Sequence, residues 1–394
     1  MLSKRRLFAG AAALVAATFL LTSGMYYYLL QTWTGDAWDA VKLFRVIQQI
    51  KTRYVEDVSV ETLMDGAVKG AVGALGDPHS TYLDKRMYRE FMIETGGSFG
   101  GVGIVIGVKD KILTVVSPIE GTPGEKAGIK SGDQILKIDG QDTKDMALDE
   151  AVNKIRGPEG TQVTLTIRRA QDTNDYTLTR TNIQIKTVGG KMLSDKIGYI
   201  RLAMFSEQTG ADFARKYQEL EQEGMKATIL DLRDNPGGLL NESVKVAGKL
   251  VPRGTVVSVV QRDGKKEVYT SDLDAVKYPL VVLVNGGSAS ASEIVAGAVQ
   301  DTGAGTLVGV KTYGKGSVQA IISPFGAGPL NVGDGTAIKL TIAKYYTPSG
   351  RSINGTGIEP DVKVEQPEPK EPGKPSASDA QLEKAIEIIK TKLK

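Results

Sequence analysis

The sequence predicts an α/β domain and a smaller β-rich domain behind an N-terminal apolar helix. Three observations lead to this prediction. From Lys196 onward, strand-like apolar runs alternate with helical runs, which is the pattern of an α/β layer. A glycine-rich block of about 75 residues precedes that region and has the size of a domain. An uncharged stretch, residues 7–30, follows Lys4, Arg5 and Arg6.

Composition excludes several classes of protein. The 394 residues include 49 basic and 46 acidic side chains, and this near balance gives no basis for nucleic-acid binding. The chain contains no cysteine, which excludes disulfides, zinc–thiolate sites and a cysteine nucleophile. A single histidine, His79, cannot build a histidine-rich metal site. We expect neither a metal nor a cofactor.

Residues 1–34 are predicted to be a signal anchor that spans a membrane. A cleaved signal has ~7–15 apolar residues, and the longer run here fits the ~20 residues of a spanning helix. Tyr26, Tyr27, Tyr28 and Trp33 fit an aromatic belt at the membrane interface. Because the cationic flank stays in the cytoplasm, the body of the protein is expected outside it. Export followed by cleavage of this segment is the alternative.

Residues 35–95 are expected to form a helical region, because Val41, Phe44 and Ile47 recur on one helical face. The segment LGDPHSTYLD ends this pattern with a turn. We interpret His79, in that turn, as a solvent-facing residue rather than a catalytic base.

Residues 96–172 are predicted to form a compact β-rich domain with one helix, at residues 147–155, and the strand QVTLTIRR. Its first loop, GGVGIVIG, resembles a dinucleotide-binding loop. However, its glycines fall as G-x-G-x-x-x-G, and a strand follows where a helix should begin. Such a loop can instead present backbone N–H groups to a peptide carboxylate, while the next strand pairs with the peptide. A tight turn into a strand is the simpler alternative.

Residues 173–365 are predicted to form the α/β core. Two of its apolar strands end in glycine turns that precede helices, DLRDNPGG at residues 231–238 and NGGSASASE at residues 285–293. Ligands of α/β sheets bind at the carboxyl ends of strands, where such turns offer N–H groups to an anion or a developing oxyanion. A βα turn without a ligand is the alternative.

Three serines on the second turn compete for the role of nucleophile: Ser288, Ser290 and Ser292. Ser290 also begins a Ser-x-x-Glu capping box with Glu293, so helix capping is its structural alternative.

A nucleophilic serine needs a base, and Lys315 fits this role. A lysine base must be buried and neutral, and no acidic residue lies between Asp301 and Lys315. In an extended segment Lys315, Ser317 and Gln319 point to one face, so Gln319 can hold the amine. Lys315 also completes the G-x-x-x-x-G-K of a phosphate-binding loop. Gly316 replaces the hydroxyl residue that this loop requires, and a strand-like segment follows, so we reject nucleotide binding.

The end of the chain is predicted to be a proline-rich linker, residues 366–378, followed by an amphipathic helix, residues 379–394.

Together these segments resemble the carboxy-terminal processing peptidases, or tail-specific proteases, a family of Ser–Lys serine proteases. The resemblance rests on LGDPHSTYL, DLRDNPGG, NGGSASASEIVAGAVQD, GVKTYGKGSVQ and KYYTPSGRSINGTGIEPDV, and it covers about residues 41–364. Residues 96–172 are similar to the circularly permuted PDZ domains of bacterial proteases. The resemblance implies a crotonase-like α/β protease core, with the PDZ domain inserted before or within it. The family usually has an aromatic residue where His79 stands.

The resemblance also implies roles for single residues. The nucleophile is Ser290, the second serine of S-A-S, and the general base is Lys315, 25 residues later. Members differ over the third residue, which corresponds here to Gln319 or Asp301, and we favour Gln319 because a carboxylate would keep the lysine protonated. The implied oxyanion donors are Ala291 and Gly237, the supporting residues Asp301 and Glu293, and the carboxylate loop of the PDZ domain Gly101, Val102, Gly103 and Ile104.

The implied activity is cleavage of exported or membrane proteins near their C-termini, with the PDZ domain binding the substrate tail and gating the site. The terminal helices are expected to mediate homodimerisation or to pack within one chain. Two other functions stay open. The chain could be a membrane-anchored PDZ scaffold without activity, or a crotonase-like acyl enzyme that binds coenzyme A.

Overall fold

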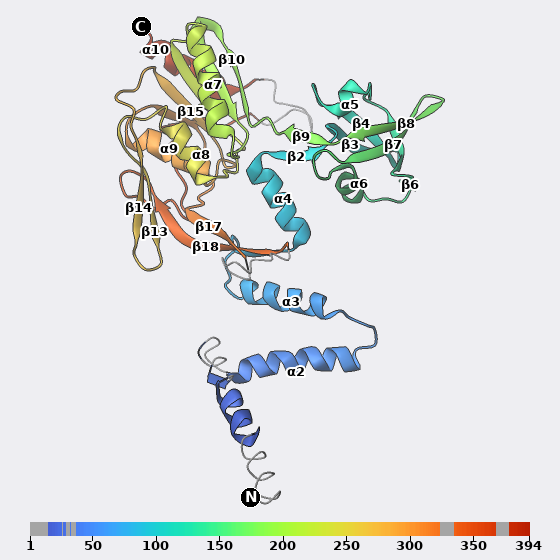
Figure 1. Cartoon of the computed structure of the whole chain (residues 1–394). Coiled ribbons are helices and arrows are strands. Elements are labelled where there is room, and N and C mark those ends of the chain that lie inside the picture. Colours follow the sequence, from blue (N-terminus) through green and yellow to red (C-terminus); the bar gives the residue numbers. More distant parts are fainter. Residues whose placement is uncertain (1–14, 26, 29–31, 33–36, 324–334, 368–377) are drawn as a thin grey trace, which may run out of the picture. The chain divides into compact units, whose positions relative to one another are not determined.

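The computed structural model of the protein describes all residues except 1–14, 26, 29–31, 33–36, 324–334 and 368–377 (Figure 1). It divides into an N-terminal unit, Met1–Tyr82, and a larger unit, Leu83–Lys394. The predicted linker, residues 366–378, lies largely outside the described residues, as does part of the predicted membrane segment. Among the described residues, no helix is long and apolar enough to cross a membrane.

The N-terminal unit is helical, as the apolar spacing predicted. It contains α2 (Ala37–Arg53) and α3 (Val60–Gly73), and the Ser59 hydroxyl caps α3 by accepting the Thr62 N–H. The sequence of strand β1 (Thr81–Leu83) spans the boundary between the two units. The larger unit then begins with α4 (Lys85–Gly96), which ends at Gly97 in the left-handed region, with φ 66°.

An antiparallel sheet forms the predicted PDZ domain. Its buried core includes Ile135, Leu165 and Ile167. The predicted boundary at residue 172 is too early, because β8 pairs with β7 along its whole length and extends to Thr179. The elements are β3 (Ile104–Lys109), β4 (Ile112–Pro118), α5 (Pro123–Lys126), β5 (Gln134–Ile138), β6 (Gln141–Asp142), α6 (Leu148–Ile155), β7 (Gln162–Arg169) and β8 (Asp172–Thr179).

The chain enters and leaves this domain through one strand pair. Strand β2 (Ser98–Gly101) pairs antiparallel with β9 (Thr181–Gln184), so Gly101 lies opposite Thr181. The PDZ domain is therefore inserted between two paired strands, immediately after α4.

The main sheet of the core has six strands. Five of them run parallel to one another, and the edge strand β10 pairs antiparallel with β11. Parallel strands end at the same edge, so β12, β15 and β16 deliver the loops DLRDNPGG, NGGSASASE and VKTYGKG to one place. The strands lie in the order β10 (Val188–Met192), β11 (Ile197–Leu202), β12 (Ala227–Asp231), β15 (Leu280–Val284), β16 (Thr306–Gly309) and β19 (Val362–Lys363).

Helices cover both faces of this sheet. In β15, Val282 and Val284 pack into the cluster that contains α7 (Thr209–Gln222), α8 (Leu240–Ala247) and α9 (Ala291–Asp301). The alternate residues, Val281 and Leu283, pack against α10 (Ala380–Lys392) through Ala385 and Ile389. Burial of these α10 side chains supports packing of the C-terminal helix within one chain.

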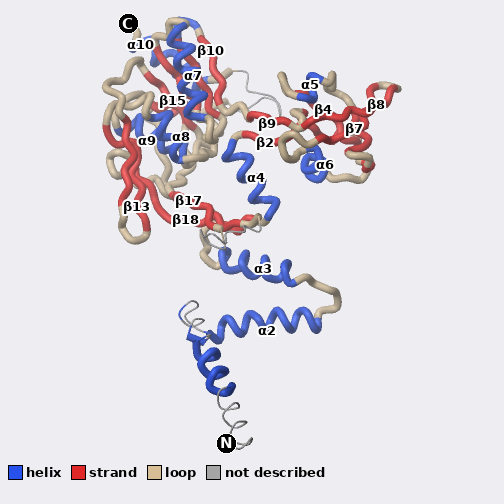
Figure 2. The backbone as a smooth tube through the Cα atoms, viewed as in Figure 1, coloured by secondary structure: helices blue, strands red, loops and turns tan. Residues whose placement is uncertain are grey.

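A second, antiparallel sheet completes the core (Figure 2). Strand β18 (Ala337–Tyr346) pairs with β17 (Ser317–Ile322) and with β13 (Gly254–Gln261), which also pairs with β14 (Lys266–Ser271). The segment after Lys315 is thus a strand, as predicted, and not the helix of a phosphate-binding loop.

Candidate active site

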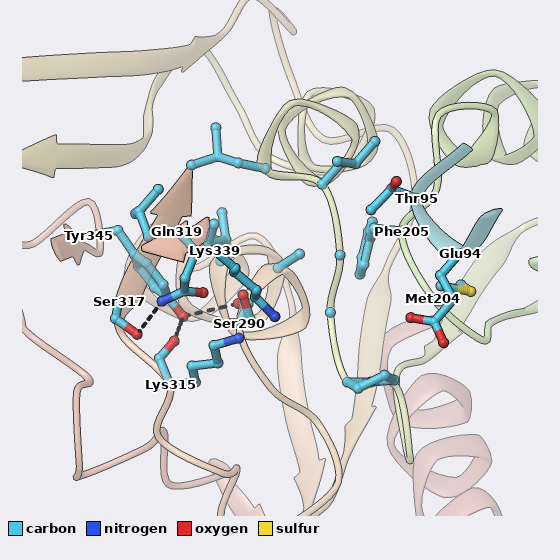
Figure 3. A pocket seen from close by; sticks show the side chains of 18 of the residues that line it. Glu94, Thr95, Met204, Phe205, Ser290, Lys315, Ser317, Gln319, Lys339 and Tyr345 are labelled. Atoms are coloured by element: carbon cyan, nitrogen blue, oxygen red, sulfur yellow. Dashed lines mark hydrogen bonds between the residues drawn. The ribbon is translucent and has the colours of Figure 1, made fainter. Parts of the chain in front are cut away.

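A cavity of about 310 Å³ lies where the loops after β12, β15 and β16 meet (Figure 3). Its walls are mostly apolar and include Phe91 of α4, Met204 and Ile294. The lining brings together five predicted site residues: Gly237, Ser290, Ala291, Lys315 and Gln319. His79 is not among the described residues that line it.

Ser290 lies between strand β15 and helix α9. Its backbone, with φ 54° and ψ −115°, has a conformation that residues other than glycine rarely adopt. Of the predicted capping box, the Glu293 half is formed, because the Ser290 N–H donates to Glu293 Oε2 at 2.9 Å. The helix therefore begins at a strained residue that also lines the cavity.

The two competing serines have structural hydrogen bonds. Both are fully buried, and the hydroxyl of Ser288 donates to the Leu232 carbonyl at 2.8 Å. The hydroxyl of Ser292 donates to the Asn235 carbonyl at 2.9 Å. These two bonds join the glycine turns after β12 and β15. Of the three serines, Ser290 alone belongs to the described cavity lining.

Lys315 reaches the same cavity from the loop after β16. Its N–H donates to Glu293 Oε2 at 2.8 Å, the oxygen that also holds Ser290. Glu94 is the one carboxylate in the described lining, and it lies beside Met204, on the other side of the cavity from Lys315 (Figure 3).

Gln319 projects from β17 toward Ser290 and Lys315 (Figure 3). Its amide nitrogen donates to Ser317 Oγ at 2.9 Å and to Thr341 Oγ1 at 3.1 Å. Because both donors are used there, the side chain presents its carbonyl oxygen, an acceptor, to the cavity.

Known protein families account for this arrangement. The model of peptidase family S41 matches residues 196–364, that of the PDZ domain residues 114–169, and that of the activating protease CtpB N-terminal domain residues 30–87. A carboxy-terminal-processing protease of Bartonella bacilliformis is 41% identical over 336 residues, which cover 82% of this chain and 74% of that protein. The carboxy-terminal processing protease CtpA of Bacillus subtilis is 40% identical over 338 residues, or 85% and 71% of the two chains. The chain belongs to peptidase family S41. It is a serine protease of the carboxy-terminal processing group and carries a PDZ domain.

In this S41 protease Asp301 lies outside the described cavity lining. Its carboxylate accepts the Ser349 N–H at 2.9 Å and the Ser349 hydroxyl at 2.6 Å, and it pairs with Arg351. Burial opposes ionisation, but these hydrogen bonds outweigh it and lower the pKa of Asp301. The contacts fasten the end of α9 to the turn after β18, whereas Gln319 shares the cavity with Ser290.

The oxyanion donors need free N–H groups, and the two neighbouring glycines differ in this respect. The N–H of Gly237 donates to Asn235 Oδ1 at 2.9 Å. In the described part of the chain, neither the Gly238 N–H nor the Ala291 N–H donates a backbone hydrogen bond, and both residues line the cavity. The geometry therefore favours Gly238 over the predicted Gly237 as the partner of Ala291.

The predicted carboxylate loop of the PDZ domain has its carbonyl groups bound inward. The Val102 carbonyl accepts the Gly124 N–H at 2.7 Å, and the Gly103 carbonyl accepts the Ile119 N–H at 2.8 Å. Gly103 has φ 70°, and a Cβ there would lie 2.2 Å from Thr122 Cβ. This conformation requires glycine and orients the peptide planes of the loop with their oxygens toward the domain.

Sequence reasoning missed two contributions to the site. Glu293 was identified only as a cap and supporting residue, although it is fully buried and binds the Lys315 loop as well. Tyr345 lies in the motif KYYTPSGRSINGTGIEPDV, which carried the resemblance, but no role was assigned to it. Its contacts depend on where β18 lies beside β17.

Proposed function

We propose that this S41 protease cleaves exported or membrane proteins near their C-termini with a Ser290–Lys315 dyad. The observation that carries the proposal is that both side chains line one mostly apolar cavity at the carboxyl edge of the parallel strands. The mechanism requires Lys315 to act as a neutral base against the Ser290 hydroxyl.

In the proposed reaction, neutral Lys315 takes the proton of the Ser290 hydroxyl as Ser290 Oγ bonds to the peptide carbonyl carbon. The N–H groups of Ala291 and of Gly238 or Gly237 stabilise the oxyanion. Lys315 then returns the proton to the leaving amine as the C–N bond breaks. Water then attacks the acyl carbon and gives a proton to Lys315, which passes it to Ser290 Oγ as the ester C–O bond breaks and the acid product leaves. Gln319 accepts a hydrogen bond from the amine without adding a charge.

The proposal is tested by cleavage of an unfolded protein substrate with purified full-length enzyme. Ser290→Ala and Lys315→Ala are expected to lower the rate by roughly 10³-fold or more. Lys311→Ala is the matched control, because this lysine lies in the same loop but is exposed and paired with Glu359 at 3.1 Å. Cleavage at the wild-type rate by either dyad variant would contradict the mechanism.

The PDZ domain is proposed to bind the C-terminal carboxylate of the substrate through residues 101–104 and to gate the site. The core is proposed to be of the crotonase type, which the glycine turns at the ends of β12 and β15 support. Its acyl-enzyme chemistry needs no coenzyme A, and addition of that ligand should leave the melting temperature unchanged.

Residues 1–34 are proposed to anchor the protein in the membrane with its body outside the cytoplasm. The support is the sequence alone, a cationic flank followed by an uncharged run. Fractionation of cells that express the full chain should place it with the membranes, and deletion of residues 1–34 should release it. Homodimerisation through the terminal helices is also proposed, and the family resemblance is its support. Sedimentation of the full chain tests it.

A further inference from the structure

Tyr345 connects the two residues of the proposed dyad through their carbonyl groups. It is 1% exposed, and its hydroxyl lies 3.0 Å from the Ser290 carbonyl oxygen and also hydrogen-bonds the Lys315 carbonyl oxygen (Figure 3). A tyrosine hydroxyl has one proton, so the two carbonyls share a single donor. The hydroxyl can serve both only if the two backbones keep a fixed separation.

Glu293 connects the same two residues through their N–H groups. Its Oε2 accepts the Ser290 N–H at 2.9 Å and the Lys315 N–H at 2.8 Å. Its Oε1 accepts the Thr312 hydroxyl at 2.6 Å and the Gly314 N–H at 2.8 Å. All these groups are donors, so a fully buried carboxylate is satisfied by the helix start on one side and the lysine loop on the other.

Ser290 and Lys315 are thus each held twice by the same two side chains, although 25 residues separate them in sequence. We propose that Tyr345 and Glu293 are positioning residues that set the distance and orientation between the Ser290 hydroxyl and the Lys315 amine. The inference rests on the dyad proposed above and extends it to the residues that hold the dyad in place.

Tyr345 is suited to this work because it stays a donor. Burial, with the nearby Glu293 carboxylate, raises the pKa of its hydroxyl well above the ordinary value, so it does not ionise where the protease works. Transfer of a proton between serine and lysine requires hydrogen-bond contact, and a misplacement of about 1 Å can cost a factor of about 100 in rate. The hydrogen bonds of Tyr345 and Glu293 to both backbones, here called the clamp, prevent such a misplacement.

The test removes the hydroxyl oxygen alone, with Tyr345→Phe. We expect kcat to fall roughly 10–100-fold with little change in KM, since the substrate contacts stay in place. The rate of labelling by a serine-directed fluorophosphonate should fall with it, and the pH at which labelling reaches half its maximum should shift, because that pH reports the amine of Lys315. Rates are referred to the folded fraction measured by circular dichroism.

The matched control is Tyr346→Phe, because the next residue of the strand points to the opposite face of β18 and is not in the described cavity lining. It should keep wild-type kcat and labelling. Glu293→Gln should resemble Tyr345→Phe, since an amide has one acceptor oxygen where the carboxylate offers two.

The outcomes separate the two proposals. Suppose that Ser290→Ala and Lys315→Ala are inactive, but Tyr345→Phe has the wild-type kcat and labelling profile per folded molecule. The proposed positioning role of Tyr345 is then wrong, and the proposed dyad is supported. A loss of activity that only follows the folded fraction has the same meaning. If either dyad variant retains full activity, the dyad is wrong and the clamp falls with it.

Discussion

Gly237 shows how closely the two glycine turns approach each other. Its φ is 102°, and a Cβ there would lie 2.7 Å from Ser290 Cβ and 2.7 Å from the Ala289 carbonyl oxygen. We expect Gly237→Ala to push the turn away from Ser290 and to lower kcat/KM by about 100-fold or more. Peptide cleavage kinetics measure this. Gly286→Ala is the control, because nothing lies within 4 Å of its Cβ position, and it should cleave at the wild-type rate.

Ser288 gives a second prediction for a single residue. Here we expect a loss of stability, whereas cleavage by the folded enzyme is retained. Its buried hydroxyl accepts the Asn285 N–H at 2.9 Å and donates to the Leu232 carbonyl. Ser288→Ala leaves both groups unpaired, so the free energy of unfolding should fall by about 1–3 kcal/mol. Folded enzyme should still cleave. If this variant is as stable as wild type but inactive, Ser288 acts in chemistry and not in structure.

The residues proposed to carry the chemistry could be identified from the sequence, whereas the contacts of the residues around them could not. Ser290 and Lys315 stand in recognisable local motifs, and the structure places both in one cavity. Tyr345 could not be found in this way, because its contacts arise from the pairing of β17 with β18.

Among the elements, α10 is joined to the loop that follows β12 by a buried guanidinium. Arg233 binds Asp231 on its own strand end and Asp379 at the start of α10, with an Nη1–Oδ1 distance of 2.7 Å to Asp379. Arg233 is directly followed by the turn that carries Gly237 and Gly238. The predicted C-terminal helix therefore supports the glycine turn that lines the cavity.

This ion pair predicts a pH dependence of stability. Burial opposes ionisation of Asp379, but the Arg233 hydrogen bond outweighs it and lowers the pKa below the ordinary value. Its contribution is present above the pKa of an unfolded aspartate, about 4, and is lost as the pH falls through the lowered pKa of the folded state. Because the side chain is 35% exposed, solvent screening limits the contribution to about 1 kcal/mol.

We therefore expect Asp379→Asn to unfold at lower denaturant concentration than wild type at pH 7, with a smaller difference at pH 3, below the pKa of an unfolded aspartate. Denaturant unfolding at the two pH values measures this. Asp195→Asn is the matched control, because Asp195 pairs with Lys390 of the same helix at 3.0 Å but both side chains are half exposed. It should change stability by less than about 0.5 kcal/mol. A difference for Asp379→Asn that is equal at both pH values would contradict the assignment.

The long periodic elements were predicted and the short ones were not. Helices α6 and α10 lie within a few residues of their predicted ranges, 147–155 and 379–394, and strands β12 and β15 end where the predicted glycine turns begin. The hairpin of β13 and β14 and the pair of β2 and β9 were missed. They are fixed by pairing between distant segments, and their own sequences carry weak patterns.

At the scale of the whole molecule, the chain connects the proposed tail-binding loop directly to the active-site wall. Helix α4 contributes Phe91, Glu94 and Thr95 to the cavity, and Val102 of the carboxylate loop follows only seven residues after Thr95. The Thr95 carbonyl also accepts the Glu207 N–H at 2.9 Å, which ties the end of α4 to the core. The proposed tail-binding loop and part of the cavity lining therefore belong to one short stretch of chain.

This connection leads to a prediction for substrates that differ only in their last group. A peptide with a free C-terminal carboxylate should be cleaved with a KM roughly tenfold or more below that of its amidated copy, because hydrogen bonds to a charged group contribute about 1.5–3 kcal/mol. In Gly103→Val the side chain would collide with Thr122, so the two peptides should give nearly equal KM values while the Ser290 labelling rate stays normal. Equal KM values in the wild-type enzyme would instead mean that the tail carboxylate is not what the PDZ domain recognises.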